Sequence, residues 1–251
     1  MFRRSNKKPS TLSTENGVVS YRLTRSSRRR SIMIRIEDTA EVNVLAPFYA
    51  RLHQIEGFIR ERSAWVAGKV DDVRKQQRAL KERRYAHGEK FLFLGKKFPL
   101  NLQAIDTKRF RIDFTGFQWD ISLPRGLSPV EAQEKIRTEL LRWYRLQAEE
   151  ILGGRIFHYS RIMGIAPEKV AIRAPKRIWG SCNHRKKVIH LNWQLILTPL
   201  EVIDYVVVHE LCHLKVPDHS NRFWNEVTKV IPEYKRQQKW LKSNRLEMVL
   251  P

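Results

Sequence analysis

The amino-acid sequence predicts an α+β fold, with a β-rich N-terminal part and helices in the middle and at the C-terminal end. Apolar and polar residues alternate between residues 18 and 44 and again between 91 and 123, which is the period of β-strands. Apolar residues three and four positions apart follow Pro47, Pro129 and Pro199, which indicates helices that begin near these prolines. Strands and helices are thus largely segregated along the chain, as in α+β folds.

Four segments are expected along the 251-residue chain. The first is a disordered basic tail, because its residues are polar and show no period. A β-rich module with inserted helices follows, then a helical connector, and then a compact domain that carries the chemical motif. The expected boundaries are 1–16 for the tail, 17–126 for the β-rich module, 127–165 for the connector and 166–251 for the C-terminal domain.

The start of the connector helix is marked by Ser128, Pro129 and Glu131. Ser128 is placed to accept a hydrogen bond from the first turn, Pro129 suits the first helical position, and Glu131 completes a capping box. Two consecutive glycines at 153–154 predict that this helix ends there. A shorter helix is expected from that point to about Met163.

The composition is that of a folded protein. Hydrophobic residues make up 42% of the chain and seven residues are tryptophan, which excludes an intrinsically disordered chain. No run approaches 18 apolar residues, so we expect no membrane-spanning helix, and the basic N-terminus lacks the apolar segment of a secretory signal. Two cysteines are too few for a disulfide framework. We therefore expect a cytoplasmic protein without a membrane partner.

The chain is strongly basic, because 48 Lys and Arg residues outnumber 26 Asp and Glu residues and leave a formal net charge of +22. Positive clusters include Arg28-Arg29-Arg30 and the run from Arg74 to Arg84. A surface of this kind attracts polyanions. No nucleic-acid-binding motif of defined spacing accompanies the charge. Nucleic acid or another acidic partner is therefore a candidate to bind the basic surface, without a specified site. The alternative is that the charge only keeps the protein soluble.

The segment after Pro199 predicts a buried helix with a metal-binding pair. Its apolar residues cover almost every side of a helix that extends to about Leu214. His209 and His213 are one helical turn apart, so both imidazoles project from one face and can reach a single Zn²⁺ ion. Glu210 lies one step round the helix, where it can take a proton from metal-activated water and pass it to a leaving amine.

His219 is expected as the third ligand of the zinc ion. Pro217 ends the helix, Ser220 is expected to cap the next one, and the chain reversal between them would bring His219 back over the helical histidines. Its spacing from the first histidine equals that of the metzincins, although their glycine and Met-turn are missing here. Glu226 and Glu233 are rival ligands, because they lie downstream as a gluzincin glutamate does. His219 could instead be a loop histidine that binds no metal.

Cys182 supports a different interpretation. Peptide deformylases combine a His-Glu-x-x-His helix with an upstream cysteine ligand, and Cys182 precedes the helix here, although the pattern around the deformylase cysteine is absent. A small-amide hydrolase of this kind is therefore an alternative to a peptidase. Cys212 is expected to be a packed thiol. The sequence also agrees with a nucleic-acid-binding protein that has a structural zinc site, or with a regulatory binder that holds no metal.

The chain contains a set of short motifs: Trp179-Gly180-Ser181-Cys182, His190-Leu191-Asn192-Trp193, residues 206–214, Asp218-His219-Ser220 and Phe223-Trp224, with Tyr21-Arg22-Leu23 near the start. Together these motifs resemble the YgjP-like metallopeptidase family. The resemblance implies a minimal zincin-type domain in which His209, His213 and His219 bind zinc and Glu210 is the general base. The related SprT-like proteases digest proteins crosslinked to DNA, which agrees with the basic charge by analogy of fold alone. The family usually has Asn at the position of Asp218.

The expected function is that of a zinc-dependent metallopeptidase, which hydrolyses peptide bonds of a protein or peptide with metal-activated water. An edge strand near residues 179–182 is expected to pair with an extended substrate. The sequence assigns no particular substrate and no oligomeric state.

Overall fold

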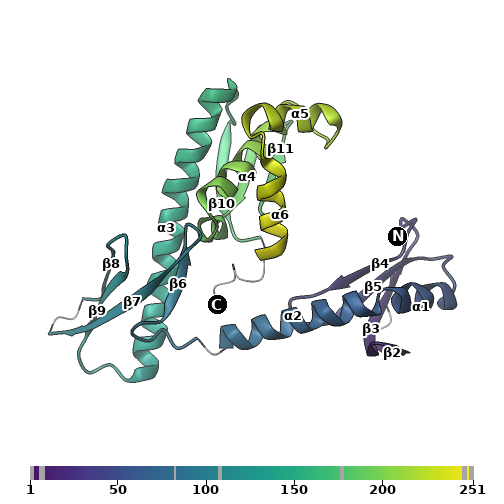
Figure 1. Cartoon of the computed structure of the whole chain (residues 1–251), viewed down its shortest axis with the longest axis horizontal. Helices are drawn as coiled ribbons and strands as arrows, with labels where there is room; N and C mark the ends of the chain where they lie inside the picture. Colours follow the sequence, from purple (N-terminus) through teal and green to yellow (C-terminus); the bar gives the residue numbers. More distant parts are fainter. Residues whose placement is uncertain are drawn as a thin grey trace. The chain divides into compact units, whose positions relative to one another are not determined.

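The computed structural model describes residues 3–5, 9–81, 83–106, 109–175, 178–244 and 248. The chain forms two compact units, one made of the residues up to Arg83 and one that runs from Arg84 to Leu250. Both units combine sheets with helices (Figure 1), so the predicted α+β fold is confirmed. Within the described ranges, no helix is long and apolar enough to cross a membrane.

The first unit is built on a mixed five-stranded sheet. Strand β3 pairs in parallel with β5 and antiparallel with β1 and β2, while β4 pairs antiparallel with the other edge of β5. Parallel pairing of β3 and β5 places the carboxyl ends of both strands at the same end of the sheet. The strands are β1 (Arg3–Ser5), β2 (Ser10–Thr14), β3 (Gly17–Ser26), β4 (Met33–Ile36) and β5 (Val42–Pro47).

Two helices cover one face of this sheet. They are α1 (Leu52–Glu61) and α2 (Ser63–Lys81), in the region where the sequence predicts helices. Because strand side chains alternate between faces, every second residue of the sheet reaches this core. The buried side chains come from the sheet and from both helices and include Val19, Tyr21, Val42, Val44, Ile55, Ile59 and Val66.

The structure differs from the expectation of a disordered tail over residues 1–16. Strand β2 lies within that range and places Leu12 opposite Val19 of β3. Both side chains are buried, so the burial of Leu12 offsets the entropy lost by ordering a polar segment. Residues 1–2 and 6–8 lie outside the described residues.

The second unit begins with a four-stranded sheet in the order β6-β7-β9-β8. The strands β8 and β9 form an antiparallel hairpin in the region where the sequence predicts strands, with Ile112 opposite Ile121. The long helix α3 (Pro129–Met163) follows this sheet, and Figure 1 shows the sheet beside the N-terminal half of α3. The strands are β6 (Lys90–Phe93), β7 (Lys96–Ile105), β8 (Arg111–Phe114) and β9 (Trp119–Pro124).

Helix α3 begins as predicted but ends later. Ser128 and Glu131 form the capping box, with the Glu131 amide donating to the Ser128 hydroxyl at 3.3 Å. The helix then continues through residues 153–154 and ends at Gly164, which has the left-handed φ of 61° typical of a C-terminal cap. The predicted end at the glycine pair is wrong, because burial of one face continues on both sides of the pair and outweighs the cost of about 1 kcal/mol per helical glycine.

The rest of the second unit places a small sheet, η1 and α4 against α3, and α5 and α6 against α4. Strand β12 (Val188–Asn192) lies between β10 (Lys169–Arg173), which is parallel to it, and β11 (Gly180–Asn183), which is antiparallel. The strand β11 is therefore an edge strand of this sheet. The helical elements that follow are η1 (Trp193–Leu197), α4 (Leu200–Cys212), α5 (Asn221–Val230) and α6 (Tyr234–Asn244).

The division into units differs from the expected domains. The sequence assigns residues 90–124 to the N-terminal module, whereas their aromatic side chains pack on α3. Phe93 and Trp119 lie with ring centroids 5.0–6.4 Å from those of Trp143 and Tyr144. Because these large rings are buried only when the sheet and α3 come together, the boundary falls before the first of these strands.

The ion pair between Arg155 and Asp204 is expected to stabilise the contact between α3 and α4. The guanidinium donates to both carboxylate oxygens, at 2.6 and 2.9 Å, and both side chains are largely buried. Asp204→Ala leaves the guanidinium unpaired, so we expect the free energy of unfolding to fall by about 2–4 kcal/mol. Urea denaturation followed by tryptophan fluorescence measures this change, because every tryptophan except Trp65 belongs to the second unit.

The matched control removes an exposed ion pair of the same unit. Glu168→Ala breaks the contact of Glu168 with Lys187, which spans 3.6 Å between exposed side chains. The free energy of unfolding should then change by less than about 0.5 kcal/mol. Equal losses for the two variants would contradict the stabilising role of the buried pair.

Candidate metal centre

Helix α4 carries two of the expected ligands and is buried on nearly every side. It begins at Leu200, with Pro199 as the residue before the helix, and ends at Cys212, close to the predicted bounds. Elements α3, α5, α6, β11 and β12 all pack against it. His209 and His213 lie on its one open side and are half-buried. The residues that fill the other sides include Val202, Ile203, Val206, Val207, Val208 and Leu211, all at most 4% exposed.

The three histidines singled out in the sequence converge on one point. The Nε2 atom of His219 lies 3.1 Å from the Nε2 atom of His209 and 3.2 Å from that of His213. Among the described residues, His209, His213 and His219 form the one group of side chains whose ligand atoms lie close enough together to hold a metal ion. The predicted reversal of the chain after α4 is therefore confirmed.

The distances and protonation of the cluster fit a tetrahedral zinc ion. Ligand nitrogens at 2.0–2.1 Å from Zn²⁺ are about 3.3–3.4 Å from one another, close to the separations observed. The Nδ1 atom of His213 donates to the Val216 carbonyl at 3.1 Å, which leaves the lone pair on the clustered Nε2 atom. Burial, reinforced by the two neighbouring imidazoles, lowers the pKa of His209 to about 3, so this ring is neutral as a metal ligand must be.

The loop between α4 and α5 presents His219 from a tight turn. The Asp218 carboxylate accepts a hydrogen bond from the Ser220 amide at 3.0 Å. Ser220 occupies the N-cap position of α5 as predicted, but its hydroxyl accepts no bond from the helix. The turn, rather than a cap, therefore sets the direction of the His219 side chain.

Aromatic rings form a wall behind the imidazoles. The Phe223 ring stacks on His213, with centroids 4.4 Å apart, and the Trp224 ring lies 5.7 Å from that of His219. Trp224 in turn stacks on Tyr234 at 5.0 Å. The sequence singles out Phe223 and Trp224 only as one of the motifs of the family resemblance. Their contact with the histidines depends on how α5 folds back over α4.

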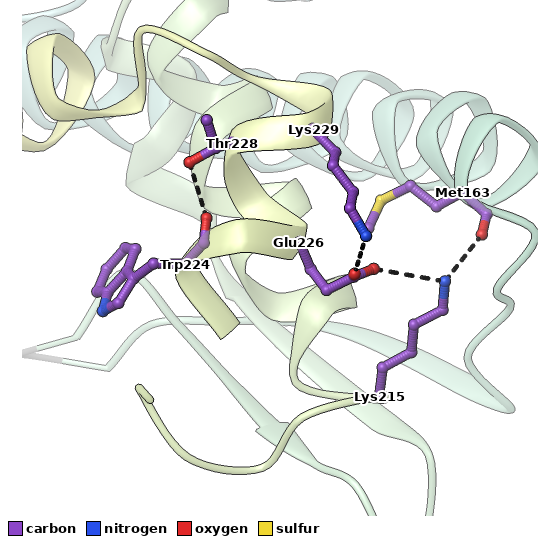
Figure 2. Close-up of polar contacts among 6 residues, drawn as sticks. All are labelled: Met163, Lys215, Trp224, Glu226, Thr228 and Lys229. Carbon is purple, nitrogen blue, oxygen red and sulfur yellow. Dashed lines mark hydrogen bonds and ion pairs between the residues drawn. The ribbon is translucent and has the colours of Figure 1, made fainter. Parts of the chain in front are cut away.

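Glu226, one of the rival ligands, is held in an ion-pair network away from the histidines. Figure 2 shows Lys215 between the carboxylate of Glu226 and the carbonyl of Met163, at 3.8 and 3.4 Å. Lys229 pairs with the same carboxylate from the other side. This network joins the end of α3 to α5, and it explains why Glu226 is not among the clustered ligand atoms. Glu233, the other rival, is exposed and also lies outside the cluster.

Glu210 is buried beside the metal cluster, in a space that only a glycine leaves open. Its side chain is 5% exposed, and burial raises its pKa to about 8. A Cβ atom placed on Gly180 of β11 would lie 2.5 Å from Oε1 of Glu210 and 2.7 Å from its Cγ. The sequence points to Gly180 only as part of a motif. Its contact with Glu210 requires β11 to pack on α4, which no local pattern predicts.

Cys182, the ligand that a deformylase-like site would use, also lies on β11 but outside the histidine cluster. Burial first, and then the negative charge of Glu210, raise the pKa of its thiol to about 11. Cys212 is fully buried, as expected of a packed thiol.

Two of the solved structures that the chain resembles are metallopeptidase zymogens. One is abylysin of Pyrococcus abyssi, which is 27% identical over 38% of this chain and 95% of that chain, with a TM-score of 0.35. The other is jannalysin of Methanocaldococcus jannaschii, which is 19% identical over 37% of this chain and 95% of that chain, with a TM-score of 0.34. No match was found among curated proteins.

The family comparison covers most of the chain. The family model described as "YgjP-like, metallopeptidase domain" matches residues 30–244, which span both units and include the whole histidine cluster. The match agrees with the resemblance that the sequence motifs indicate. The chain therefore belongs to the YgjP-like metallopeptidase family.

Proposed function

We propose that this metallopeptidase uses zinc held by His209, His213 and His219, with Glu210 as the general base. The observation that carries the proposal is the convergence of three imidazole Nε2 atoms next to a buried carboxylate. Three protein ligands with a fourth position left for water or substrate are typical of catalytic rather than structural zinc sites. A nucleic-acid binder with structural zinc would have no use for the buried carboxylate, which favours the enzyme.

The residues of this chain have three roles in the reaction: the histidines would hold the metal, their neighbours orient the imidazoles, and Glu210 transfers a proton. Zinc supplies Lewis acidity at such a site, which polarises a carbonyl and makes water more acidic. The Glu210 carboxylate accepts the proton of the attacking water and donates it to the leaving nitrogen, which is the general acid–base role. Hydrogen bonding of His213 to Val216 and the turn at Asp218 keep the imidazoles oriented throughout.

The edge strand β11 supports a peptide as the substrate. It pairs with β12 on one side, and no other strand among the described residues pairs with its second edge. Gly180, its first residue, touches the Glu210 side chain, so this edge lies next to the reacting groups. An extended peptide could pair with β11 by main-chain hydrogen bonds, which would bring its scissile bond to the metal.

Metal content separates the histidine site from a site that uses the cysteine. His219→Ala removes one of three ligands, so we expect the purified variant to hold less than about a tenth of the wild-type zinc after dialysis against a weak chelator. Cys182→Ser should keep one zinc per chain, because Cys182 lies outside the cluster. Elemental analysis by mass spectrometry measures both. Loss of zinc from the cysteine variant alone would favour the deformylase-like hydrolase.

Cleavage of an unfolded protein tests the role of Glu210. Glu210→Gln keeps the size of the side chain but cannot accept a proton, so we expect kcat to fall by about 10²–10⁴-fold while zinc content stays at one per chain. Gel analysis of a reduced, unfolded substrate, with and without single-stranded DNA, measures the rate. Glu226→Gln is the matched control and should keep most of the activity. Unchanged activity of the zinc-loaded Glu210→Gln variant would contradict the assignment.

The space at Gly180 is expected to be necessary for activity. A Cβ atom in Gly180→Ala would overlap the Glu210 carboxylate, so the carboxylate must move and kcat should fall at least about tenfold with zinc retained. Gly154→Ala, at a helical glycine with open space around it, is the control and should leave kcat unchanged. The kcat of each zinc-loaded variant checks this. Wild-type kcat in Gly180→Ala would show that catalysis does not require the Glu210 carboxylate to lie against residue 180.

A further inference from the structure

Two loops meet at one end of the sheet in the first unit. Ser26, the last residue of β3, lies opposite Pro47, the last residue of β5, in a parallel pair. The chain leaves β3 into residues 27–32 and leaves β5 into residues 48–51. Both segments therefore lie at the carboxyl end of these strands, although more than fifteen positions separate them in the sequence.

Hydrogen bonds hold the second loop to β3 and to the first loop. The Arg25 guanidinium donates to the carbonyls of Phe48, at 3.2 Å, and of Ala50. The Tyr49 hydroxyl donates to the Arg30 carbonyl at 3.1 Å. The two loops thus lie against each other, and the hydrogen bond of the Tyr49 hydroxyl holds its ring in place.

Neither loop at this end of the sheet contains an acidic residue. None occurs between Glu15 and Glu37, or between Glu41 and Glu56. Glu56 lies in α1, which follows the second loop, while the other acidic residues nearest in sequence lie at the β2–β3 and β4–β5 turns, at the opposite end of the sheet. The first acid-free stretch holds Arg22, Arg25, Arg28, Arg29, Arg30 and Arg35.

Two arginines of the β3–β4 loop have freely exposed guanidinium groups. Arg28 and Arg30 are exposed and form no ion pair within the described part of the chain. Arg29, between them, is half-buried: its Nη2 atom donates to Sδ of Met33 at 3.5 Å, and its Nε atom is buried without a hydrogen-bond partner. Guanidinium groups of this kind are suited to bind phosphate oxygens in pairs.

Two aromatic residues in the second loop are exposed to solvent. Tyr49 is 75% exposed and Phe48 is 40% exposed. Burial of such rings would stabilise them, so exposed rings that follow each other in one loop indicate a surface that a partner covers. Exposed rings and guanidinium groups at the same end of one sheet match the chemistry of bases and phosphates.

We propose that Arg28, Arg29, Arg30, Phe48 and Tyr49 form a binding surface for single-stranded nucleic acid. The arginines bind the phosphate backbone, and the two rings stack on bases. A single strand fits better than a duplex, because bases must be unstacked from each other to meet the rings. This interface belongs to the first unit and does not rest on the peptidase activity of the second.

The experiment measures binding of the full chain to fluorescently labelled 12-nucleotide DNA and RNA strands by polarisation, over a series of salt concentrations. Tyr49→Ala should weaken binding about 5- to 150-fold, the range found for loss of one stacking ring. Tyr49→Phe keeps the ring and loses only the hydroxyl bond to Arg30, so it should bind like the wild type. Circular dichroism of each variant reports whether the unit is folded.

The charge contribution is tested with a double variant and a matched control. Arg28→Ala with Arg30→Ala should make the slope of log affinity against log salt shallower by about 1.4, since each phosphate contact to a single strand contributes about 0.7. Arg236→Ala with Lys239→Ala removes the same charge from exposed positions of α6 and should leave the slope unchanged.

Three outcomes would overturn the proposal. The first is equal weakening by both double variants, which would mean non-specific attraction by net charge. The second is tighter binding to duplex than to single strands, or to phosphatidylserine vesicles than to either. The third is wild-type affinity in Tyr49→Ala. The binding surface and the metal site lie in different units, so Glu210→Gln should bind nucleic acid like the wild type. A failure of the binding proposal therefore leaves the peptidase proposal unaffected.

Discussion

The second unit depends on one constraint, which is that helix α4 is buried on nearly every side while the face with His209 and His213 stays open. A helix this apolar is stable only when other elements surround it. The sheets, α3, α5 and α6 supply that cover and share a single core with it. The metal-binding face is therefore set in a rigid scaffold, where two imidazoles keep a fixed separation before any ion arrives.

Elements on two sides of this helix complete the site near its C-terminal end. The turn after α4 returns His219 to the helical pair, and the aromatic wall of α5 packs behind the rings. The Lys215–Glu226 ion pair ties that helix to the end of α3. On the other side, β11 approaches so closely that only Gly180 fits against Glu210. Precision at the reacting groups thus comes from contacts between elements rather than from the motif itself.

In the first unit, the sheet topology determines where the basic residues gather. A formal charge of +22 indicates only a general attraction to polyanions. The parallel pairing of β3 and β5 gathers Arg28, Arg29 and Arg30 at the same end of the sheet as two exposed rings, while the acidic turns lie at the other end. The net positive charge of the chain is thus concentrated, in this unit, at the carboxyl end of β3 and β5.

The sequence by itself determined the α+β class, the buried helix and the two histidines one turn apart, because helical periodicity is local and repeats within a few residues. It also indicated His219, since Pro217 limits where the chain can turn. Only the tertiary structure decided the length of α3, the unit boundary before the aromatic strands, the strand formed by residues 10–14 and the place of Gly180 beside Glu210. Each of these depends on burial against residues far along the chain, and local propensities carry no information about such contacts.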